Sequence, residues 1–200
     1  MRFYLDITLL PDAEVNIGFI WQKVYQQIHI ALVENKTAQN ESAIAVSFPK
    51  YGEKFPLGNT LRLLANEQSQ LENLNVEKWL SRLTDYTHLK SIKEVPVTVT
   101  QFARFKRKQF KSNLEREAKR RAKYKGETFD EALAHFQNYE IKTSLPFINM
   151  TSLSTEGGAS LNRNFKLFID KEMVAEQGQG LLNCYGLSKG GAGTVPWFTS

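Results

Sequence analysis

The sequence predicts an α+β protein, on the basis of three observations. Short runs rich in strand-forming residues alternate between apolar and polar positions. A longer segment after Asn16 instead repeats its apolar residues at helical spacing. The composition is 42% hydrophobic and 12% aromatic, which suits a folded chain with a substantial core. The 200 residues are enough for one large domain or two small ones.

The first half of the chain predicts the order strand, helix, strand, strand, helix, strand. The run 3–10 is rich in strand formers and ends at Pro11, and the helical spacing that follows reaches Val33. The predicted elements are strand 3–10, helix 16–33, strands 42–49 and 59–66, polar helices around 67–73 and 76–84, and an extended segment within 93–110. This order is the ferredoxin-like one, which RNA-recognition domains share (RRM-like).

The second half predicts two helices followed by short strands. A basic helix covers about 113–125, and a second helix covers 128–141. Four short strands with Gly-rich turns are then predicted within 145–155, 164–172, 180–191 and 194–198. We therefore expect a ferredoxin-like domain over 1–95 and a C-terminal domain over 96–200.

Several classes of protein are disfavoured by the composition. No apolar run approaches the roughly 20 residues that span a bilayer, and two aspartates within the first twelve residues argue against a signal peptide. We expect a soluble, cytoplasmic protein with no membrane partner. Cys184 is the only cysteine, and the three histidines are far apart in the sequence, so we expect neither a metal site nor a cofactor. The histidines are His29, His88 and His135.

Positive charge is concentrated in residues 104–125. This stretch holds eleven Lys and Arg against two Glu, a net charge of +9 in a chain whose total is +5. Its first part alternates like a strand, and Ser112 with Glu115 then forms a capping-box pattern that starts a helix. One face of that helix carries four cations at helical spacing. They are Arg116, Lys119, Arg120 and Lys123.

Three interpretations of the basic stretch are weighed. A solvated helix face is the commonest, but such faces usually alternate in sign, whereas here like charges repeat at i, i+3 and i+4. A membrane-surface helix needs a broad apolar face, which this helix lacks. A nucleic acid offsets the repulsion, so we favour it. Arg107 and Gln109 suit base edges, and aromatics such as Phe165 could stack on bases, although strand Phe residues are more often core.

Candidate catalytic residues are sparse. Ser152 and Ser154 lie in a polar segment without the GxSxG pattern of serine hydrolases. Tyr185 begins a Gly-rich loop that does not match the phosphate-binding GxxxxGK[ST] pattern. His29 alone is more often structural than catalytic. An RNA ligand favours the catalytic interpretation of His29, because the ribose 2′-OH is a built-in nucleophile and histidine is suited to move its proton.

Several short motifs are distributed along the whole chain. They include "YLDI" at 4–7, "IHIALV" at 28–33, "VSFP" at 46–49, "KSN" at 111–113 and the C-terminal "CYGLSKGG" with "VPWF". The motifs "LPF", "SLST" and "FKLFI" lie between them. In these motifs and in their order, the chain resembles one family, the CRISPR repeat-RNA processing endoribonucleases of the type I-F systems.

The resemblance implies an N-terminal ferredoxin-like domain and a divergent C-terminal domain that together bind the stem-loop of CRISPR repeat RNA. It implies metal-independent cleavage at the 3′ base of the stem by attack of the 2′-OH, leaving a 2′,3′-cyclic phosphate. The protein would stay bound to its product and join other subunits of a type I-F surveillance complex. The implied catalytic residues are His29, Ser152, Ser154 and Tyr185. The implied RNA-binding residues are Arg107, Gln109, Asn113, Arg116, Lys119, Arg120, Lys123 and Phe165.

Two other functions stay open at this point. The chain could be a non-catalytic subunit that binds an RNA hairpin. It could also be a structural subunit whose basic helix meets an acidic protein.

Overall fold

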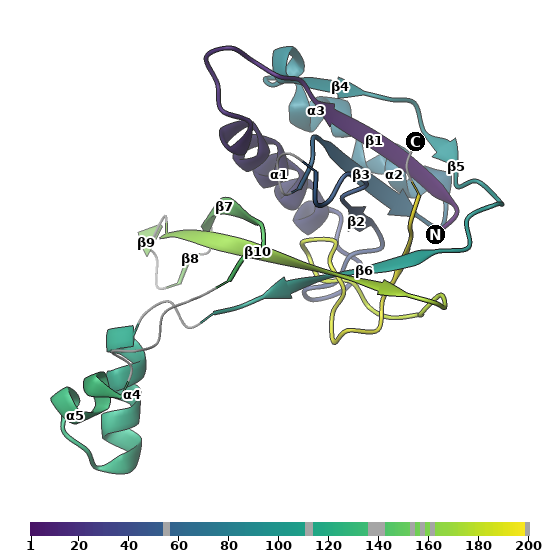
Figure 1. The fold of residues 1–200 in the computed structure, drawn as a ribbon. Helices are drawn as coiled ribbons and strands as arrows, with labels where there is room; N and C mark the ends of the chain where they lie inside the picture. The colour runs from purple at the N-terminus through teal and green to yellow at the C-terminus, as the bar shows by residue number, and fades with distance from the viewer. Residues whose placement is uncertain are drawn as a thin grey trace. The chain divides into compact units, whose positions relative to one another are not determined.

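The computed structural model describes residues 1–53, 57–110, 114–135, 143–152, 155–156, 159–160 and 163–198, and it has an α+β fold with antiparallel sheets. The chain divides into two compact units. Unit 1 comprises Met1–Arg107 with Pro146–Ser200, and unit 2 comprises Lys108–Leu145. Figure 1 shows the course of the chain through both.

The first sheet of unit 1 has the strand order β2-β3-β1-β4, with β5 also pairing with β1. Its pairs are antiparallel, and Asp6 of β1 lies opposite Arg62 of β3. The strands are β1 Phe3–Leu9, β2 Ala45–Ser47, β3 Thr60–Ala65, β4 Thr87–Leu89 and β5 Lys93–Glu94. The strand-forming runs 3–10, 42–49 and 59–66 are thereby confirmed as strands.

The helices of unit 1 contact this sheet and one another. The helices are α1 Ile17–Glu34, α2 Gln68–Leu74 and α3 Val76–Leu80, with a 3₁₀ turn at Thr84–Tyr86. Helix α1 begins at Asn16, whose side chain accepts a hydrogen bond from the Gly18 N–H, 2.7 Å away. Its apolar residues recur at helical spacing and are buried, and α1 packs against α3 and β1. The predicted helix 16–33 is confirmed.

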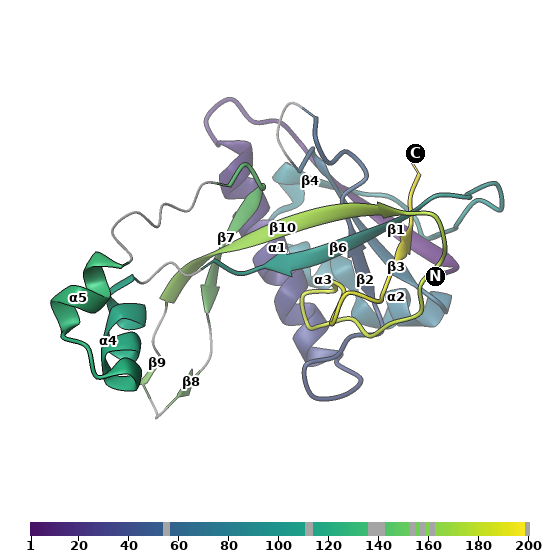
Figure 2. The same cartoon turned by 60° about the horizontal axis from the view of Figure 1, so that its bottom comes forward.

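A second sheet of unit 1 has the order β11-β6-β10-β7. The strands are β6 Phe102–Lys108, β7 Phe147–Ser152, β10 Arg163–Val174 and β11 Val195–Pro196. The short strands β8 Thr155–Glu156 and β9 Ala159–Ser160 pair with each other. Phe105 of β6 is buried and packs edge-on against Phe48, 5.3 Å between ring centroids. In Figures 1 and 2, β7 runs beside α1, in agreement with their contacts.

Arg62, which forms a buried ion pair within the first sheet, also ties the C-terminal segment to that sheet. The Arg62 guanidinium donates to both carboxylate oxygens of Asp6, at 2.7 and 2.9 Å, and to the Phe198 carbonyl at 2.8 Å. Its charge lies over the rings of Phe198 and Tyr4, 3.9 and 4.6 Å from their centroids. Because both charges are buried, replacing either residue alone would leave the other charge buried without its partner and would destabilise the fold.

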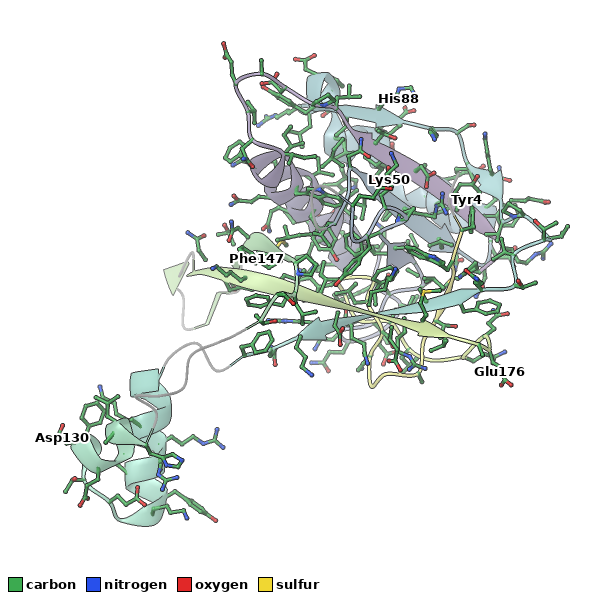
Figure 3. The ribbon with its side chains drawn as sticks, viewed as in Figure 1. Tyr4, Lys50, His88, Asp130, Phe147 and Glu176 are labelled. Atoms are coloured by element: carbon green, nitrogen blue, oxygen red, sulfur yellow. The ribbon has the colours of Figure 1, made fainter. Side chains whose placement is uncertain are left out.

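Unit 2 contains α4 Leu114–Lys125 and α5 Phe129–Ala134. Small buried side chains, Ala118 of α4 and Ala132 of α5, lie where the two helices pack. Helix α5 begins with a capping box between Thr128 and Glu131, and it carries Asp130, labelled in Figure 3. The predicted helix over 128–141 ends at Ala134, and its positions 136–141 lie outside the described residues. The predicted cap at Ser112 also lies outside them.

The extended segment predicted within 93–110 is confirmed, because β5 pairs with β1 and β6 belongs to the second sheet. Strand β4 Thr87–Leu89, which also pairs with β1, was not predicted. One prediction of a strand needs correction. Segment 180–191 was expected to be a strand, yet it forms turns with isolated bridges at Leu182 and Ser188. Positive φ angles at three of its glycines bend the backbone away from an extended path. The expected boundary near residue 95 stays a prediction.

Within the described residues, no helix is both long and apolar enough to cross a membrane.

Candidate active site

Helix α1 carries His29 at the border of its buried face. The Nδ1 atom of His29 lies 2.9 Å from the carbonyl oxygen of Cys184. Because a carbonyl oxygen only accepts hydrogen bonds, Nδ1 must carry the proton. The neutral ring therefore keeps its lone pair on Nε2, which is the arrangement of a proton acceptor.

The ring of Tyr185 stacks on the imidazole of His29. Their centroids are 4.1 Å apart, and the rings are within 5° of parallel. The turn that carries Tyr185 is held by the Asn183 side chain, whose oxygen accepts from the backbone N–H groups of Tyr185 and Leu187 at 2.9 and 3.2 Å. The Tyr25 hydroxyl, one turn before His29 on α1, donates to the Tyr185 carbonyl at 2.9 Å. His29 is thus part of α1, and Tyr185 is held to α1 by this hydrogen bond.

Gly186 allows this turn to approach strand β2 closely. Its φ is +70°, and its carbonyl accepts a 2.8 Å hydrogen bond from the Val46 N–H. A Cβ at this position would lie 2.6 Å from Val46 Cγ2 and 3.0 Å from Val46 N. A side chain would meet both a steric clash and an unfavourable backbone conformation.

The guanidinium of Arg107, at the end of β6, lies between two aromatic rings. Its central carbon is 5.3 Å from the ring centroid of Phe165, on β10, and 5.2 Å from that of Tyr185. Such cation–π contacts hold a planar cation at a fixed height above the rings. One aromatic–cation cluster therefore extends from His29 through Tyr185 and Arg107 to Phe165.

Burial and charge shift the pKa values of the stacked pair. Burial lowers the pKa of His29 below its ordinary 6.5, the hydrogen bond to Cys184 opposes that shift, and the nearby Arg107 cation adds to it. Burial raises the pKa of the Tyr185 phenol, against the opposing Arg107 cation. At neutral pH the imidazole is therefore mainly neutral and the phenol protonated.

Ser152 lies at the end of β7, which contacts α1. Phe165 pairs with Met150 in the β7–β10 ladder, so Ser152, two residues further on, lies on the same face of the sheet as Phe165. Ser152 itself is half-buried. The neighbouring residue ties this strand to the helix of His29, because the Thr151 N–H donates to the Gln26 side-chain oxygen at 3.0 Å.

The comparisons with known proteins agree with one another. The family model described as CRISPR-associated protein (Cas_Csy4) matches residues 4–198. The chain belongs to the Csy4 family of CRISPR-associated proteins. Two curated relatives bear the name "CRISPR-associated endonuclease Cas6/Csy4". The one from Escherichia coli (strain UTI89 / UPEC) is 33% identical over 200 residues, and the one from Pseudomonas aeruginosa (strain UCBPP-PA14) is 34% identical over 203 residues. Each alignment covers 99% of this chain and 100% of the relative. The resemblance seen in the sequence is confirmed.

The structure brings together some of the residues that the Csy4 resemblance singled out. His29, Tyr185, Arg107 and Phe165 form the cluster described above, and Ser152 lies on the neighbouring strand. Ser154 and Asn113 lie outside the described residues. The roles of all these residues stay predictions.

The remaining predicted residues lie in unit 2. Gln109 follows β6 and is exposed, as are Lys119, Arg120 and Lys123 on α4. Arg116 is part of α4, but its side chain is not among those described. Arg121 of α4 forms an ion pair with Glu127, with 2.8 Å between Arg121 Nε and Glu127 Oε2. Lys119, Arg120 and Lys123 are thus exposed cations of α4.

Across the described residues, no group of three or more His, Cys, Asp or Glu side chains is arranged to hold a metal ion.

Sequence reasoning missed four residues that build the site. Tyr25, Gln26, Asn183 and Gly186 all position the stacked pair or its neighbouring strand. Tyr25 could have been found, because it lies four residues before His29 on the same helix. The hydrogen bond of Gln26 joins positions 125 residues apart, so no local pattern signals it.

Proposed function

We propose that this chain is a metal-independent endoribonuclease that binds the stem-loop of CRISPR repeat RNA and cuts it at the 3′ base of the stem to make guide RNA. The observation that carries the proposal is the hydrogen bond from His29 Nδ1 to the Cys184 carbonyl, which leaves Nε2 as the proton acceptor. Membership of the Csy4 family and the endonuclease names of its relatives support the same function.

In the proposed reaction, Nε2 of His29 takes the proton of the ribose 2′-OH next to the cut. The 2′ oxygen then forms a bond to the adjacent phosphorus as the bond from phosphorus to the 5′ oxygen breaks. The leaving 5′ oxygen takes up a proton, which the imidazolium just formed can supply. The products are a 2′,3′-cyclic phosphate and a 5′-OH. The lowered pKa of His29 keeps the ring neutral, and so able to accept a proton, at neutral pH.

The proposed roles of the other catalytic residues follow from the same arrangement. Tyr185 stacks on the imidazole and limits its rotation, while the Cys184 carbonyl selects the tautomer. We assign Ser152 to the ribose at the cut, with Ser154 as a second hydroxyl of the site. Fixed placement of these groups would contribute to the rate by reducing the motion that must be frozen out on reaching the transition state.

The proposed RNA contacts divide into base recognition and phosphate binding. Arg107 and Gln109 would read purine edges, and Phe165 would stack on the terminal base pair of the stem. Asn113 and the basic face of α4 would bind the RNA groove and its phosphates. That face comprises Arg116, Lys119, Arg120 and Lys123.

We further propose a ferredoxin-like domain over 1–95 and an RNA-binding domain over 96–200. The strand order β2-β3-β1-β4, with helices after β1 and β3, supports the ferredoxin-like assignment. The cytoplasm is the proposed location. Other subunits of a type I-F surveillance complex are proposed partners.

The test is cleavage of the cognate hairpin RNA in the presence of EDTA, with analysis of the product ends. The expected result is a single cut that leaves a 2′,3′-cyclic phosphate. Tight binding without cleavage would favour a non-catalytic hairpin-binding subunit. Failure to bind hairpin RNA would favour a structural subunit whose basic helix meets an acidic protein.

A further inference from the structure

Gln26 joins the helix of His29 to the strand of Ser152. It lies three residues before His29, so the two side chains are neighbours on the surface of α1. Its side-chain oxygen accepts the 3.0 Å hydrogen bond from the Thr151 N–H, next to Ser152 on β7. One short amide side chain thus bridges the two elements that carry the proposed proton acceptor and the proposed ribose-binding hydroxyl.

The hydrogen bond satisfies a backbone group that the sheet leaves open. Strand β7 stands at the edge of the second sheet, and its neighbour in the described strand order is β10. Alternate N–H groups of an edge strand point away from the sheet and need another acceptor. Gln26 supplies it at Thr151, whose hydroxyl also donates to Asn164 on β10 at 3.0 Å. The end of β7 is therefore fixed from both sides, one residue before Ser152.

A glutamine at position 26 costs free energy through the burial of its amide group, unless the hydrogen bond to Thr151 offsets that cost. The Nε2 atom of Gln26 is buried and has no hydrogen-bond partner among the residues that the structure describes. A buried amide donor without a partner costs free energy, whereas an apolar side chain of the same length would fill the space without that cost. Because Thr151 presents a donor, the side-chain oxygen must face β7.

We propose that Gln26 is a positioning residue for cleavage, which holds β7, and through it Ser152, in register with His29. This role rests on the proposed function. Misplacement of reacting groups by about 1 Å can slow a reaction by about 100-fold. Loss of the Gln26 hydrogen bond should therefore slow the chemical step while leaving hairpin binding, which uses a much wider surface, unchanged.

Three substitutions separate the hydrogen bond from simple packing. Gln26→Met keeps the length of the side chain and removes the acceptor. Gln26→Glu keeps an acceptor for Thr151 and removes the Nε2 donor. Gln27→Met makes the same chemical change at the next position of α1 and serves as the matched control.

The measurements are the single-turnover cleavage rate with enzyme in excess, the Kd for an uncleavable 2′-deoxy hairpin, and the melting temperature of each variant. Rates are compared well below the lowest melting temperature and on the high-pH plateau of each pH–rate profile. The plateau matters because a carboxylate near His29 raises the pKa of the imidazole.

We expect Gln26→Met to lower the plateau rate about tenfold or more with Kd within about twofold of wild type. We expect Gln26→Glu to recover most of that rate and Gln27→Met to match wild type. A wild-type rate in Gln26→Met, an equal loss in Gln26→Glu, or a parallel loss of hairpin affinity would each overturn the positioning role. An inactive wild-type protein would instead overturn the proposed function, and this role with it.

Discussion

The cluster around His29 and the helix α4 differ in how their side chains are held. His29 is stacked, hydrogen-bonded and largely enclosed, and the residues around it are tied to three separate segments of unit 1. The cations of α4 project from a helix whose packed side uses small residues such as Ala118. Each of Lys119, Arg120 and Lys123 is exposed.

The difference reflects what each region is proposed to do. Proton transfer requires a defined tautomer and distances fixed within fractions of an ångström, which only a packed environment supplies. Phosphate binding depends mainly on the number of cations and tolerates mobile side chains. Substitutions in the two regions should therefore separate catalysis from affinity.

The largest effect is expected for His29→Ala. Removal of the proton acceptor should lower the single-turnover cleavage rate by about 1,000-fold, within the range of general acid–base catalysis. The Kd for hairpin RNA should change little, because one side chain contributes little to a wide interface. His88→Ala is the control, since His88 lies exposed on β4 (Figure 3). Equal losses of rate and affinity in His29→Ala would argue against the proposed separation.

The second prediction concerns the basic surface of α4. Replacing Lys119, Arg120 and Lys123 together by Gln should weaken hairpin affinity and leave the cleavage rate at saturating enzyme near wild type. The slope of log K against log salt should become shallower by about 1 for each phosphate that the helix no longer neutralises.

A matched variant controls for the loss of charge alone. Lys78, Arg82 and Lys93 are exposed on unit 1 and provide the same two Lys and one Arg for replacement by Gln. This control should keep most of the salt dependence. An unchanged slope in the α4 variant would show that the helix does not bind phosphates.

A smaller effect is expected for Gly186→Ala. The new Cβ would clash with Val46 at a φ of +70°, so the free energy of unfolding should fall by about 2–4 kcal/mol. Gly190→Ala is the control, because its φ of +68° is similar but nothing lies within 4 Å of its Cβ. Its cost should be limited to the backbone term, about 1–2 kcal/mol. Urea denaturation measures both, and equal costs would contradict a close contact at Val46.

The smallest effect is a shift in the titration of His29. The pKa of His29 should lie below the ordinary histidine value of 6.5 in the free protein. The ring therefore becomes protonated, and stops being able to act as a base, only when the pH falls below 6.5. Arg107→Gln removes a nearby cation and should raise this pKa. Arg104→Gln, whose guanidinium pairs with Glu172 at 3.2 Å, should leave it unchanged. NMR titration of the imidazole protons measures the pKa of His29 in each protein. A value at or above 6.5 in wild type would contradict the claim that burial lowers this pKa.

Long, periodic elements could be predicted from the sequence, whereas short or turn-based ones could not. Helix α1 carries a hydrophobic period that is visible over many residues, and strand β1 is a seven-residue run rich in strand formers. Strand β4 has three residues, too few for a period, and its pairing with β1 decides its structure. Segment 180–191 has apolar residues typical of a strand, yet side-chain hydrogen bonds of Asn183 and the left-handed Gly186 make it a turn.

The candidate site, like the fold, could be predicted only in part from the sequence. His29 and Tyr185 were singled out through short motifs of the family, and the structure places their rings in contact. The Cys184 carbonyl and the Gln26 amide act through tertiary contacts that span more than 100 residues of sequence. Local periodicity carries no information about such contacts, so the tautomer of His29 could not have been predicted.

The central claim is that His29 accepts a proton from the ribose 2′-OH at the cut. The most direct test uses hairpin RNA with a single 2′-deoxy nucleotide immediately upstream of the cut, in EDTA, with wild-type protein in excess. We expect hairpin binding equal to that of the all-ribose RNA and no cleavage at that position. Cleavage of the deoxy substrate would contradict the claim, because the nucleophile would then have to come from elsewhere.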